Sequence, residues 1–192
     1  MESTRERIVD AAAHVMRTLG LARATTKEIA RAAGCSEALL YKHFRAKEDL
    51  FLAVLQERLP GDLPALLAAL ADSAGRGTVG ENLERVAEAA ITFYTESFPM
   101  AASIFSELRL LDGYREGLRE RGVGPQTANA GIAAYLRAEQ ALGRVRPDAD
   151  PEALASLLLG GCLHHVFLSN FTEREPAADT ARALVRALVR EV

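Results

Sequence analysis

Hydrophobic residues recur at helical spacing along the chain, and glycine or proline separates one such segment from the next. The first segment, residues 4–19, has the periodicity of an amphipathic helix. Thr25, followed three residues later by Glu28, has the pattern of a capping box and predicts the start of a second helix. Ser36 is a suitable N-cap for a third, short helix over residues 37–43.

The second and third helices are joined by a short turn that contains Gly34. Two short helices with a tight glycine-containing turn are the sequence form of a helix-turn-helix. Leu40 and Phe44 lie four residues apart, so we expect both to anchor the third helix in a core. The rest of that helix is then left free to enter a DNA major groove. A fourth helix is expected from Lys47.

The remainder of the chain continues as helix after helix, with no convincing strand, internal repeat or low-complexity tract. We therefore predict an all-α protein, with an N-terminal three-helix DNA-binding domain over residues 1–50 and a helical ligand-binding and dimerisation domain over residues 51–192. In the second domain, we expect helices over residues 63–70, 81–96, 99–111, 125–142, 151–171 and from 176 to the terminus, with a polar segment over residues 114–121.

Charge changes this picture only modestly. The chain has a net charge of −3, but residues 1–50 hold nine basic and seven acidic residues, and its three lysines all lie between Lys27 and Lys47. A basic end on an acidic body is typical of a protein that presents that end to phosphate, although an arginine-rich composition alone could produce it. Two distant cysteines indicate neither a disulfide framework nor a zinc site. No apolar run suggests a membrane span or a leader, so we expect a cytoplasmic protein.

The stretch Thr25–Ser36, continued by Leu40–Phe44 and Lys47–Leu50, closely resembles the DNA-binding domain of the TetR family of bacterial transcriptional regulators. The resemblance covers roughly residues 5–55, and the later helices resemble the family only in layout. It implies a homodimeric regulator of double-stranded operator DNA with a small-molecule effector.

Carried over residue by residue, the resemblance implies a DNA-contacting set that consists of Thr26, Lys27, Ser36, Glu37, Ala38, Leu39, Tyr41, Lys42, His43 and Lys47. Thr26, Lys27, Tyr41 and His43 match positions that reach phosphates, which fix the register without reading sequence. Base reading is expected of Glu37, Ala38, Leu39 and Lys42. Two readings stay open: Tyr41 and His43 as plain surface residues, and Glu37 as a partner of the helix dipole. The chain departs from the family at Ala38, often glycine, and at Ala46, often a capping residue.

The second domain supplies candidates for an effector pocket, since such pockets are apolar with a few polar groups. The candidate set is Phe93, Tyr94, Phe98, Met100, Phe105, His164 and Phe167, with plain core as the alternative for each. His164 and His165 are adjacent and point about 100° apart on a helix, so they cannot share a metal site. We expect one to face the core and the other a dimer seam. Gly160-Gly161, in an apolar helix, predicts close helix approach across that seam.

These observations favour a repressor that an effector releases from a palindromic operator. An activator or a ligand-independent regulator would carry the same DNA-binding domain. An enzyme is disfavoured because no phosphate loop, metal quartet or nucleophile motif is present, and no cofactor is expected. A protein adaptor that uses the helix-turn-helix has no positive support.

Overall fold

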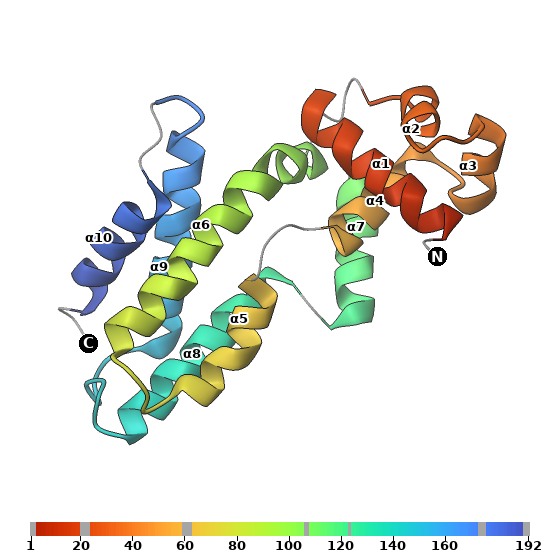
Figure 1. Cartoon of the computed structure of the whole chain (residues 1–192). Coiled ribbons are helices and arrows are strands. Elements are labelled where there is room, and N and C mark those ends of the chain that lie inside the picture. Colours follow the sequence, from red (N-terminus) through yellow and green to blue (C-terminus); the bar gives the residue numbers. More distant parts are fainter. Residues whose placement is uncertain are drawn as a thin grey trace. The chain divides into compact units, whose positions relative to one another are not determined.

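The computed structural model describes residues 3–19, 24–58, 63–105, 108–122, 124–172 and 176–189. Within these ranges the regular structure is helical and no strand occurs, so the predicted all-α class is confirmed. The elements, shown in Figure 1, are α1 (Thr4–Leu19), α2 (Thr26–Ala32), α3 (Glu37–His43), α4 (Lys47–Glu57), α5 (Leu63–Leu70), the 3-10 helix η1 (Ala71–Ser73), α6 (Val79–Ile104), α7 (Leu108–Arg121), α8 (Pro125–Ala141), α9 (Pro151–Leu168) and α10 (Ala177–Val189).

The chain forms two compact units, and the N-terminal one is larger than the sequence suggests. Unit 1 contains residues 1–60 and 97–122, and unit 2 contains residues 61–96 and 123–192. The predicted division at residue 50 would cut through α4. In the structure α4 belongs to unit 1, because its buried Leu50 and Phe51 share one hydrophobic core with α1, α2 and Met100.

Helix α6 is longer than expected and belongs to both units. The sequence predicts one helix over 81–96 and a second that begins at Pro99, but α6 runs without a break from Val79 to Ile104. Proline suits the first turn of a helix, and this preference led to the wrong prediction. Inside a helix its main cost is one lost backbone hydrogen bond and crowding of the preceding turn, which a long, packed helix can bear.

Unit 1 is held together around α1, which packs against α2 and α4, while α7 packs against α4. At the surface Arg5 of α1 forms an ion pair with Glu57 of α4, with 2.6 Å between Nη2 and Oε1. The Arg5 guanidinium also lies 5.3 Å from the centroid of the Phe44 ring, a cation–π distance. These contacts join α1 and α4 next to the end of α3.

In unit 2, α8 packs against α5 and α9, and α10 packs against α9. A Cβ atom at Gly161 would lie 2.9 Å from Cδ2 of Leu184, so the absent side chain lets α10 approach α9. This contact lies within one chain, which corrects the expectation that Gly161 serves a dimer seam. Gly160 is different: nothing lies within 4 Å of a Cβ built there.

A buried polar cluster closes one end of unit 2. Asn82 Nδ2 donates to the hydroxyl of Tyr135, and the backbone N–H of Gly75 donates to Glu139 at 3.2 Å. Glu139 is fully buried and its carboxylate lies 3.3 Å from Arg144, which offsets part of the cost of burying its charge. Burial raises the pKa of Tyr135 to about 12. The cluster ties the end of α8 to the loop before α6.

Among the described residues, α9 is the one helix long and apolar enough to cross a membrane, judged by length and composition alone. This differs from the expectation that no segment qualifies. Its buried residues face α8 and α10, and a helix at the centre of a helical bundle has the same composition. The absence of a membrane partner stays a prediction.

Candidate nucleic-acid interface and a cavity beside α9

Local hydrogen bonds define the start of α2 as the sequence predicts. The backbone N–H of Glu28 donates to Thr25 Oγ1 at 3.2 Å, and the Thr25 N–H donates back to the Glu28 carboxylate at 3.2 Å. Both halves of the predicted capping box are therefore present. After α2 the chain turns at Gly34, whose φ of 63° is in the left-handed region that favours glycine.

The recognition helix α3 is short and depends on its cap and its anchors. Ser36 accepts a hydrogen bond from the backbone N–H of Leu39 at 3.2 Å. Leu40 is fully buried and Phe44 is 5 % exposed, which confirms both predicted anchors. A helix of seven residues has little stability of its own in water, so packing of these two side chains holds α3 in place.

The rest of α3 faces solvent. Glu37, Ala38, Tyr41, Lys42 and His43 are exposed, and Leu39 is half-buried. From the other elements, Lys27 and Ser36 are exposed, while Thr26 and Lys47 are half-buried. The structure therefore brings the whole DNA-contacting set to the surface of unit 1, around α2, α3 and the start of α4. Contact of these residues with DNA remains a prediction.

Three members of the DNA-contacting set bond to each other, which the sequence analysis did not foresee. Thr26 Oγ1 donates to Glu37 Oε1 at 2.6 Å, and the Tyr41 hydroxyl lies 3.4 Å from Thr26 Oγ1. We call these residues the Thr26–Glu37–Tyr41 cluster. Thr26 comes from α2 and the other two from α3, so their proximity depends on how the helices cross, and no spacing in the sequence reports it.

Two exposed arginines also lie near this surface. Arg31 lies in the last turn of α2 and Arg45 follows α3, and both side chains are exposed. Cations at these places would strengthen attraction to phosphate. The sequence analysis did not single out Arg31 or Arg45. The high number of basic residues in the first 50 positions could have indicated them.

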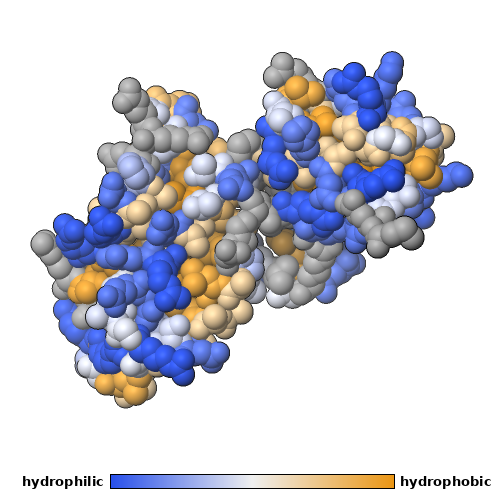
Figure 2. Space-filling view, viewed as in Figure 1, coloured by the Kyte–Doolittle hydropathy of each residue, from blue (hydrophilic) through white to orange (hydrophobic). Residues whose placement is uncertain are grey.

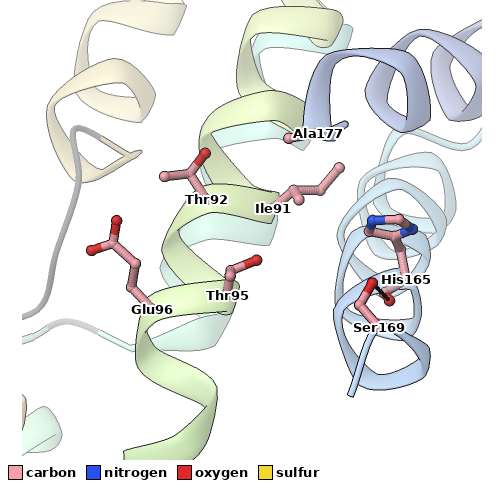
Figure 3. Close-up of a pocket in the computed structure, with 7 residues that line it drawn as sticks. All are labelled: Ile91, Thr92, Thr95, Glu96, His165, Ser169 and Ala177. Atoms are coloured by element: carbon pink, nitrogen blue, oxygen red, sulfur yellow. Dashed lines mark hydrogen bonds between the residues drawn. The ribbon is translucent and has the colours of Figure 1, made fainter. Parts of the chain in front are cut away.

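In unit 2, a cavity of about 220 Å³ lies beside α9, which we call the α6–α9 cavity (Figure 3). In Figure 3, Ile91 and Thr95 extend from α6 on the side of α9, whereas Glu96 extends away from it. The hydroxyl of Ser169 donates to the carbonyl of His165 at 2.9 Å. The cavity is lined by Ile91, Thr92, Thr95, Glu96, His165, Ser169 and Ala177.

None of the seven predicted pocket residues lines this cavity. Met100 is buried in the core of unit 1, Phe105 is 77 % exposed, and Phe98 also belongs to unit 1. In unit 2, Phe93 and Tyr94 contact each other edge to face, with ring centroids 5.7 Å apart. The predicted pocket residues are therefore divided between the two units, and their role in effector binding stays a prediction.

The adjacent histidines face different surroundings, as expected. The candidate pocket set contains His164, whereas His165 is the histidine that lines the α6–α9 cavity. His165 lines the cavity, with Nδ1 3.4 Å from the Thr180 hydroxyl, while His164 is exposed. Phe167 is also exposed and contacts Phe171, with ring centroids 5.3 Å apart. Among the described residues, no three His, Cys, Asp or Glu side chains gather as metal ligands.

Known proteins resemble this chain in sequence over its N-terminal helices, where the DNA-contacting set lies. A family model described as bacterial regulatory proteins, tetR family, matches residues 8–54. The HTH-type transcriptional regulator SrpR of Pseudomonas putida is 44 % identical over 57 residues, which are 30 % of this chain and 27 % of SrpR. The chain thus matches about a quarter of the length of that relative.

Solved structures resemble the whole fold. A putative TetR-family transcriptional regulator from Mesorhizobium loti is 22 % identical, with a TM-score of 0.78 over 97 % of this chain and 95 % of that chain. FadR from Bacillus subtilis, solved in complex with stearoyl-CoA, is 17 % identical, with a TM-score of 0.69 over 97 % of this chain and 98 % of that chain. At these identities the likeness concerns the fold.

Proposed function

We propose that the chain, whose residues 8–54 match the family model of bacterial regulatory proteins of the tetR family, is a transcription repressor that a small molecule releases from a palindromic operator. Its relatives are DNA-binding regulators of transcription rather than enzymes. The observation that carries the proposal is the exposure on unit 1 of the DNA-contacting set, around a helix that is anchored by its buried Leu40. Such a helix presents its polar face to a major groove, and a two-fold dimer presents two.

The first experiment is selection of bound DNA from a random library with the purified full chain. We expect one enriched palindrome, with half-sites about one helical turn apart. Lys42→Ala should weaken binding, because it removes an exposed cation of α3, while Arg137→Ala on α8 in unit 2 is the control. Failure of the wild-type chain to enrich any sequence at low salt, where phosphate contacts are strongest, would refute the proposal.

We infer a homodimer from the exposed apolar side chains of α9. Leu157 is 65 % exposed and Phe167 is 46 % exposed, and both lie on the same helix as the open Gly160. Figure 2 shows hydrophobic residues among hydrophilic ones on the visible surface of the protein. Large exposed apolar side chains concentrated on one helix are typical of an interaction surface. Leu157→Asp should give a monomer by sedimentation, whereas Ala130→Asp on α8 should not. A wild-type monomer at micromolar concentration would contradict the dimer.

For the effector, we propose the α6–α9 cavity as the binding site. Its volume suits a small organic molecule, and it combines apolar Ile91 with hydroxyl and imidazole groups, as ligand pockets commonly do. FadR of Bacillus subtilis was solved with stearoyl-CoA, but about 220 Å³ holds only a much smaller ligand. Residues 79–96 of α6 belong to unit 2 and residues 97–104 to unit 1, so one helix can carry the response between the units.

The effector site can be tested on the operator complex. Compounds from a metabolite and drug panel that release the operator from wild-type protein are retested on Ala177→Phe, which fills the cavity. We expect this variant to bind the operator but no longer to respond, while Ala130→Phe responds normally. An unchanged response of Ala177→Phe would place the effector elsewhere.

Because a regulator must reach the chromosome, we propose a cytoplasmic location.

A further inference from the structure

The Thr26–Glu37–Tyr41 cluster uses its hydroxyl protons internally. The single hydroxyl proton of Thr26 goes to Glu37 Oε1, at 2.6 Å between the oxygens. In the 3.4 Å contact between Tyr41 and Thr26, the donor must then be the Tyr41 hydroxyl. The protons therefore run in one direction, from Tyr41 to Thr26 to Glu37, and neither hydroxyl has a proton left for a phosphate oxygen.

Glu37 has one carboxylate oxygen engaged and one open. Its Oε2 atom makes no hydrogen bond among the described residues, and the side chain is exposed on the first turn of α3. The capping position is occupied by Ser36, which already accepts from the Leu39 N–H. The Glu37 carboxylate instead reaches across to α2. If Glu37 served only as a partner of the α3 dipole, its carboxylate would not need to bond to Thr26 of α2.

A carboxylate on a DNA-facing surface is repelled by phosphates, so it is tolerated only where it finds a donor. In the major groove the base-edge donors are the amino groups of cytosine N4 and adenine N6. Adenine also presents the N7 acceptor beside its amino group, which repels a carboxylate, whereas cytosine presents no acceptor edge there. The chemistry of Glu37 therefore matches cytosine.

From this geometry we propose that Glu37 reads a cytosine through its open carboxylate oxygen, and that Thr26 and Tyr41 are positioning residues that hold Glu37 in place. The inference rests on the proposed operator binding and adds a base preference to it. It also replaces the expectation that Thr26 and Tyr41 donate to phosphates. Fixing one oxygen of a flexible side chain restricts its rotamers, and a preorganised acceptor discriminates better than a mobile one.

The test compares operator selection by the full-length wild type and four variants. Wild-type protein should prefer cytosine over adenine at one symmetry-related position by about 5- to 150-fold. Glu37→Gln should shift that position to adenine, because glutamine pairs with adenine N6 and N7. Thr26→Val should reduce the preference several-fold at that position alone, and Thr26→Ser should restore it. Glu48→Gln, an exposed site on α4 with the same charge change, should leave the preference unchanged.

Each outcome has a distinct meaning. An unchanged base profile for Glu37→Gln would overturn the inference while leaving operator binding intact. Equal weakening by Thr26→Val on every sequence, with the cytosine preference preserved, would assign Thr26 to a phosphate and also overturn it. If wild-type protein enriches no sequence, the proposed function and the inference both fail. Circular dichroism of each variant shows that the helices are retained.

Discussion

Truncation of Leu40 to alanine tests whether one buried side chain holds the recognition helix in place. Leu40 is fully buried, and it is the buried residue of the seven-residue α3. Buried leucine-to-alanine changes cost about 2.7–5.0 kcal/mol, from lost transfer energy and the remaining cavity. Because α3 has little intrinsic stability, we expect Leu40→Ala to lower its local free energy of unfolding by about 3 kcal/mol.

Hydrogen exchange read by mass spectrometry on a peptide over residues 37–44 measures this local opening. A global melting curve would be less direct, because the chain has two compact units. About 3 kcal/mol corresponds to roughly 150-fold faster exchange, at about 1.4 kcal/mol per factor of ten. Leu39→Ala is the matched control: Leu39 is half-buried on the same helix, so its truncation should cost under about 1 kcal/mol. Equal acceleration in both variants would refute the argument that Leu40 anchors α3.

Three further predictions concern unit 2. Because burial raises the pKa of Tyr135 to about 12, its neutral phenol stabilises the fold below pH 10, and this contribution is lost between pH 10 and about 12. The free energy of unfolding measured in urea should therefore fall more steeply with rising pH in the wild type than in Tyr135→Phe, and equal slopes would contradict this. Gly161→Ala should be about 1–3 kcal/mol less stable than Gly131→Ala, an open helical site, because the added methyl meets Leu184 at 2.9 Å; similar melting temperatures would exclude the clash. Asp150→Ala should cost about 1 kcal/mol, since Asp150 caps α9 by accepting two backbone N–H groups, and a loss near zero in thermal denaturation would show that the cap is dispensable.

Most of the helical framework could be predicted because its signals are local. The capping box at Thr25 and Glu28, the Ser36 cap and the turn at Gly34 each act within a few residues, and the structure shows all of them. The burial of Leu40 follows from helical periodicity in the same way. The DNA-contacting set, by contrast, is what the resemblance of this stretch to the TetR family implies.

The errors arose where distant segments decide the outcome. Pro99 has a local preference for the first turn of a helix, but α6 runs through it from Val79 to Ile104, so that local preference did not decide where the helix begins. Met100 and Phe105, two of the predicted pocket residues, belong to unit 1 and do not line the α6–α9 cavity, and their role in effector binding stays a prediction. Whether His164 or His165 faces that cavity depends on the rotation of α9, which no local pattern specifies.

The sequence by itself determined that the chain is helical, where the helix-turn-helix begins and ends, and that Leu40 is the buried side chain of α3. Caps, turns and periodicity depend on neighbours within about one helical turn. Tertiary structure alone decided that Thr26 and Tyr41 meet Glu37, that Gly161 admits Leu184, and that a cavity opens beside His165. These contacts join residues far apart in the chain, and their geometry is set by how whole helices pack against each other.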